Sequence, residues 1–65
     1  MSKEYFEMRE ADYTLRIANL DQMRKRAAAR GQILLAKSCA KQITDLEHRL
    51  ELLRQERSAA EVSDD

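Results

Sequence analysis

Gly31 is the only glycine in this 65-residue chain, and the chain contains no proline. The middle of the sequence is therefore the only place with a strong backbone break. Residues 27–30 combine helix-forming alanines with an arginine, a cation that is favoured in the last turn of a helix. A glycine that follows such a run can take the left-handed conformation that ends many helices. The sequence predicts two helices, at about residues 3–30 and 33–57, with a turn near Gly31.

The spacing of apolar residues favours a hairpin over one long rod. A continuous coiled coil keeps a seven-residue repeat along its whole length. The second predicted helix has such a repeat, but the register of the first helix carried forward is offset by five residues, and coiled coils absorb insertions of three or four. The predicted fold is therefore all-α, an antiparallel, coiled-coil-like two-helix hairpin over residues 1–57. The predicted hairpin core consists of Tyr13, Ile17, Leu20, Cys39, Ile43, Leu46, Leu50 and Leu53.

The chain is short for a self-sufficient core, because small domains bury too little apolar area to offset the entropy lost on folding. One cysteine excludes an internal disulfide, and one histidine and one cysteine without paired-ligand spacing predict no metal site and no cofactor. No nucleophile, base and stabilising group can be combined, so an enzyme is not expected. The remaining means of stabilising so small a domain is contact with another chain. We therefore expect the hairpin to be completed by a partner or by self-association.

The apolar faces of both predicted helices are wider than a two-helix seam requires. The first helix has a second small apolar stripe, and the second helix has apolar residues over nearly half of its circumference. We expect the surplus to form a partner interface containing Met8, Leu15, Ile33 and Leu35. This pattern predicts a non-enzymatic protein-binding module.

The charges do not favour nucleic acid as the partner, because twelve basic and twelve acidic residues leave no net charge. Residues 1–31 carry seven basic and five acidic side chains, and residues 32–65 carry five and seven, so the halves are expected to attract weakly. One basic cluster keeps an alternative open, a regulatory or nucleic-acid-binding homodimer of four helices. A generic coiled-coil adaptor is a further alternative. The cluster consists of Arg24, Lys25, Arg26 and Arg30.

The sequence also allows predictions about the location of the protein, its C-terminal tail and several single residues. No segment approaches the roughly 18 consecutive apolar residues of a membrane span, and the charged N-terminus lacks the apolar region of a signal peptide, which predicts a cytoplasmic protein. Residues 58–65 are small and acidic and are expected to form a flexible tail. Cys39 is expected to pack as a small apolar residue and His48 to face solvent. The aromatic residues, Tyr5, Phe6 and Tyr13, suit either partner contacts or packing against the second helix.

Two stretches of sequence carry a resemblance to a known family. The first predicted helix ends in "MRKRAAARGQ", and the second reads "AKSCAKQITDLEHRLELL", so a basic helix end and an Arg-Gly turn precede a Leu/Ile-rich stripe. With these features, over roughly residues 11–53, the chain resembles the YscE-like family, small co-chaperones of the bacterial type III secretion needle subunit. The resemblance implies a cytoplasmic, non-enzymatic virulence protein that stabilises a repeat-type chaperone. Together they would keep the needle subunit unpolymerised before export.

Overall fold

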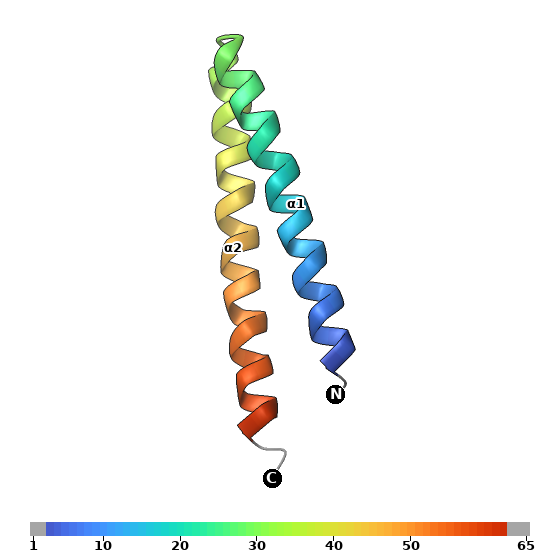
Figure 1. The fold of residues 1–65 in the computed structure, drawn as a ribbon. Helices are drawn as coiled ribbons and strands as arrows, with labels where there is room; N and C mark the ends of the chain where they lie inside the picture. The colour runs from blue at the N-terminus through green and yellow to red at the C-terminus, as the bar shows by residue number, and fades with distance from the viewer. Residues whose placement is uncertain (1–2, 63–65) are drawn as a thin grey trace.

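Two long helices run antiparallel to one another in the computed structural model, which describes residues 3–62 (Figure 1). Helix α1 covers Lys3–Ala29 and helix α2 covers Ile33–Val62. The part of the chain that the structure describes contains no strand. The molecule is a rod with extents of 53 × 16 × 10 Å. The predicted all-α helical hairpin is therefore confirmed.

The turn between the helices is built around Gly31, as predicted. Its φ of 75° lies in the left-handed region, which glycine adopts without the steric cost that a Cβ atom brings. Two hydrogen bonds close the end of α1: the Gln32 N–H donates to the Ala27 carbonyl at 2.8 Å, and the Gly31 N–H donates to the Ala28 carbonyl at 3.1 Å. This pair of bonds defines a Schellman motif, which satisfies carbonyl groups that a helix end would otherwise leave free.

Helix α2 extends further than the sequence predicts. The predicted end near residue 57 is corrected to Val62, so residues 58–62 of the predicted tail are helical. The physical reason lies partly in packing, because Ala60 contacts the core cluster that contains Phe6. An ion pair one turn apart, between Arg57 and Glu61 at 3.3 Å, also supports the last turns. The rest of the predicted tail, residues 63–65, lies outside the described residues.

Buried side chains differ in size between the two ends of the hairpin. At the open end, Phe6 and Tyr13 from α1 form a cluster with Leu50 and Leu53 from α2. Nearer the turn, the buried residues are the small Ala27 and Cys39. In Figure 1 the helices separate toward the chain ends. This divergence matches the sizes of the buried side chains, because aromatic and leucine side chains need more room between two helix axes than alanine or cysteine does.

All eight predicted core residues lie on the inner sides of the two helices. Tyr13, Cys39, Leu50 and Leu53 are buried, and Ile17, Leu20, Ile43 and Leu46 are half-buried. Phe6 is buried as well, and the exposed Tyr5 ring meets it edge-on, with centroids 5.4 Å apart and planes at 79°. Two of the three aromatic residues therefore pack inside the hairpin.

Candidate protein-binding surface

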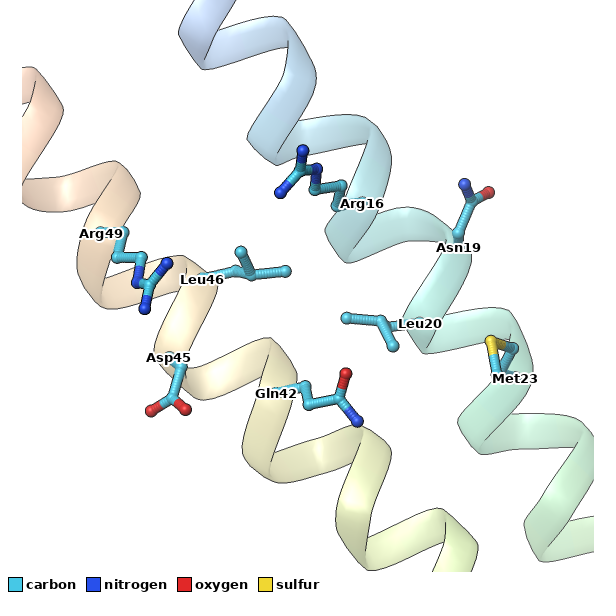
Figure 2. Close-up of a pocket in the computed structure, with 8 residues that line it drawn as sticks. All are labelled: Arg16, Asn19, Leu20, Met23, Gln42, Asp45, Leu46 and Arg49. Carbon is cyan, nitrogen blue, oxygen red and sulfur yellow. The ribbon is translucent and has the colours of Figure 1, made fainter.

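A groove runs between the two helices on one side of the hairpin (Figure 2). Leu20 from α1 and Leu46 from α2 point toward one another across it, and both are half-buried. Polar side chains line its edges, so the groove has an apolar floor between two polar margins. The lining residues are Arg16, Asn19, Leu20, Met23, Gln42, Asp45, Leu46 and Arg49.

A second hollow continues this groove toward the chain ends. It shares Arg49 with the first hollow and is lined also by Tyr5 and Leu52, both of which are exposed. Met23 is an exposed apolar residue in the first hollow. Leu35 precedes Gln42 of that hollow by seven residues, or two helical turns, and therefore lies on the same side of α2. We call this side, with Tyr5, Leu20, Met23, Leu35, Leu46 and Leu52, the groove face.

The structure does not bring the four predicted interface residues onto one surface. Met8 and Leu15 are 73% and 61% exposed and lie two turns apart on α1. They belong to the outer side of α1, away from the buried Tyr13 stripe. Ile33 and Leu35 are also exposed, but both lie in the first turn of α2, beside Gly31. The predicted interface is thus divided between an outer stripe and the turn end, where Leu35 is also part of the groove face.

Three exposed apolar residues were missed by the sequence reasoning, whereas the exposed Tyr5 had been considered for partner contacts. Leu34 is the most exposed large apolar side chain of the described residues, at 84%. The available signal was the run of three aliphatic residues at the start of α2, since consecutive helical positions cannot all face one core. The other two, Met23 and Leu52, fall on the margins of the heptad seams, where spacing alone does not separate core from surface.

The basic cluster before the turn is partly neutralised by its own helix. Asp21 receives hydrogen bonds from Arg24 at 2.7 and 3.3 Å and an ion pair from Lys25 at 3.2 Å. The hydrogen bond from Arg24, followed by that from Lys25, lowers the pKa of the Asp21 carboxyl below its ordinary value. Arg26 and Arg30 are exposed. Two of the four cations therefore have an anionic partner one turn away.

Charge attraction between the helices is limited to one contact among the described residues. Arg54 Nε lies 3.1 Å from Glu10 Oε2. The other described ion pairs join residues of the same helix. The net charges of the two sequence halves therefore contribute to the hairpin mainly through this pair, and apolar packing holds the rest of the seam.

The described residues offer little reactive chemistry. Between residues 3 and 62 no group of three His, Cys, Asp or Glu side chains could hold a metal ion. Cys39 is a buried free thiol and His48 is exposed. Neither described helix is long and apolar enough to cross a membrane. What this surface can do is make apolar contacts and ion pairs with another molecule.

Comparison with known proteins adds no relative to this description. No protein-family model, no curated protein sequence and no solved structure matches the chain.

Proposed function

We propose that this chain is a non-enzymatic protein-binding module whose groove face receives a helix of a partner protein. The observation that carries the proposal is the groove itself, with half-buried Leu20 and Leu46 on its floor and exposed apolar side chains along its length. An amphipathic helix that lies in such a groove buries its own apolar stripe and the surplus apolar surface of the hairpin together. The exposed groove-face residues are Tyr5, Met23, Leu35 and Leu52.

We further propose that the module acts as a cytoplasmic co-chaperone of the YscE-like kind. The support is the resemblance of residues 11–53, combined with a hairpin that leaves apolar surface exposed. The expected partners are a repeat-type chaperone, whose stacked helices present extended binding surfaces, and through it the needle subunit. Binding would stabilise the chaperone by mass action and keep the assembly-prone subunit covered until export.

Co-purification tests this function with two matched variants. The full chain is co-expressed with a repeat-type needle chaperone, as wild type, as Met23→Glu/Leu52→Glu on the groove face, and as Met8→Glu/Leu15→Glu on the outer stripe. Both variants add the same charge at exposed positions, on two different surfaces of the hairpin. We expect the groove variant to weaken the complex by at least about 100-fold, because two buried charges replace apolar contacts. The outer-stripe variant should retain it.

Three results would contradict the proposal. Loss of the complex in the outer-stripe variant alone would place the partner on α1 instead. Sedimentation of the isolated chain as a stable four-helix homodimer that binds no chaperone would favour the adaptor alternative. A cooperatively folded monomer at micromolar concentration, without binding of an apolar dye, would remove the reason for a partner.

A further inference from the structure

The charges of the hairpin are sorted along its length. Residues 22–44, which form the half next to the turn, contain six basic residues and no acidic residue. The other described residues, 3–21 and 45–62, contain six basic and ten acidic residues. Because the chain folds back at Gly31, these two segments meet at the open end. The rod therefore has a positive turn end and a negative open end.

Exposed aliphatic side chains gather at the positive end. Ile33, Leu34 and Leu35 are 56%, 84% and 45% exposed and are the first three residues of α2, directly after the turn. Figure 1 shows that this turn is one extremity of the rod. Successive side chains of a helix point about 100° apart, so these three face three directions. A single helix docked on one side would leave at least one of them in water, whereas a soft surface met end-on would cover all three.

Four cations lie on the two chain segments next to this aliphatic tip. Lys37 follows Ile33 by four residues and Lys41 follows Lys37 by four, so the three lie along one side of α2. Arg30 directly precedes the turn, and Arg26 lies one helical turn earlier on α1. All four are exposed, and none takes part in the ion pairs found within residues 3–62. Their long side chains can reach toward the tip while their charges stay in water.

We propose that the turn end binds an anionic lipid surface, with the aliphatic tip entering the headgroup region and the four cations contacting headgroup phosphates. Apolar contact and attraction to anionic lipids are the two contributions that hold a protein on a membrane surface. Nucleic acid fits the tip less well, since its phosphates would engage the cations and leave the aliphatic side chains exposed. The acidic open end would point away from the membrane.

Vesicle co-sedimentation of the full chain tests this inference. The vesicles contain phosphatidylcholine alone, or phosphatidylcholine and phosphatidylglycerol in equal amounts. We expect partition onto the anionic vesicles only, weakened by added salt. Leu34→Ser should lower the partition coefficient roughly tenfold. Lys37→Gln/Lys41→Gln should lower it by about 5-fold for each cation removed.

Met8→Ser is the matched control, because Met8 is nearly as exposed as Leu34 but lies toward the open end. It should leave the partition unchanged, and circular dichroism verifies the helix content of each variant. Equal partition of wild type and Leu34→Ser, equal binding to neutral and anionic vesicles, or no binding to either would overturn the inference. So would retention on a single-stranded RNA that exceeds binding to anionic vesicles. The groove variant Met23→Glu/Leu52→Glu leaves the tip intact, so chaperone binding and lipid binding can fail independently.

Discussion

Arg54 of α2 donates a hydrogen bond from Nε to the Glu10 carboxylate of α1 across 3.1 Å, joining residues 44 positions apart in the sequence. The contact lies beside the open-end core cluster and matches one register of the two helices. A shift of either helix by one turn, about 5.4 Å, would separate the charges. The ion pair therefore forms only in the register of α1 and α2 that the packing of the apolar seam establishes.

Removing this pair should cost little stability. Both side chains keep contact with solvent, at 55% and 33% exposure, and pairs of this kind contribute about 0 to 1 kcal/mol. We expect a double-mutant cycle of Arg54→Ala and Glu10→Ala, measured by urea denaturation, to give a coupling energy below about 1 kcal/mol. A coupling above about 2 kcal/mol would mean that the charges, and not the apolar seam, determine the register.

In the last turns of α2, only the side that packs against the core cluster should contribute to the stability of the hairpin. Ala60 is half-buried against the cluster around Phe6, whereas its neighbour Ala59 is exposed. Ala60→Asp should lower the free energy of unfolding by about 1 to 3 kcal/mol, because a carboxylate would be placed at an apolar contact. Ala59→Asp adds the same charge near the same helix end and is the control. Equal effects of both substitutions in chemical denaturation would contradict the packing of Ala60.

Substitutions of Gly31 should change the stability of the hairpin through the backbone conformation of this residue and not through the volume of the new side chain. A Cβ atom at this position would meet nothing within 4 Å, but φ is +75°. Gly31→Ala should therefore destabilise the hairpin by about 1 to 2 kcal/mol through the left-handed conformation alone. Gly31→Asn should cost less, since asparagine tolerates this region better than alanine. Thermal denaturation that ranks the two variants in the opposite order would show that side-chain space matters at the turn.

Asp21 should make the stability of the hairpin depend on acidic pH. Hydrogen bonds from Arg24 and Lys25 lower the pKa of its carboxyl in the folded state. A lowered pKa means that the stabilising contribution is complete above the unfolded-state pKa, about 3.9, and is lost as the pH falls through the folded-state value. Asp21→Asn should therefore be less stable than wild type at neutral pH, with a gap that narrows below about pH 4. The group is at the surface, so added salt should reduce the gap.

The end of α2 shows why the fold was more predictable than its boundaries. The seam residues from Cys39 to Leu53 follow a seven-residue repeat, which is visible in that part of the sequence alone. Ala60 carries no such signal, because an alanine is compatible with a helix, a tail or a surface. Only the folded hairpin, in which Ala60 packs against the cluster that contains Phe6, gives the last turns an apolar contact to keep.

The candidate site was less predictable for a related reason. Met8 and Leu15 have helical spacing, and so do many pairs on the outer side of a helix. Which exposed residues share a surface depends on how α1 and α2 are juxtaposed, and the groove through Leu20 and Leu46 exists only between them. A periodic pattern places a residue on a helix face and leaves its neighbours on the other helix undetermined.

The sequence by itself determined that this chain forms two helices that turn at Gly31, because one flexible residue and two incompatible heptad registers leave no other simple arrangement. It also determined which residues form the seam. Read in sequence order, its charges suggest a basic first half and an acidic second half. The tertiary structure decided where these charges lie in space, since folding at Gly31 brings residues 22–30 beside residues 33–44 and places this basic stretch at one end of a rod. Electrostatic fields depend on where charges lie in space, and that is settled only when the helices pair.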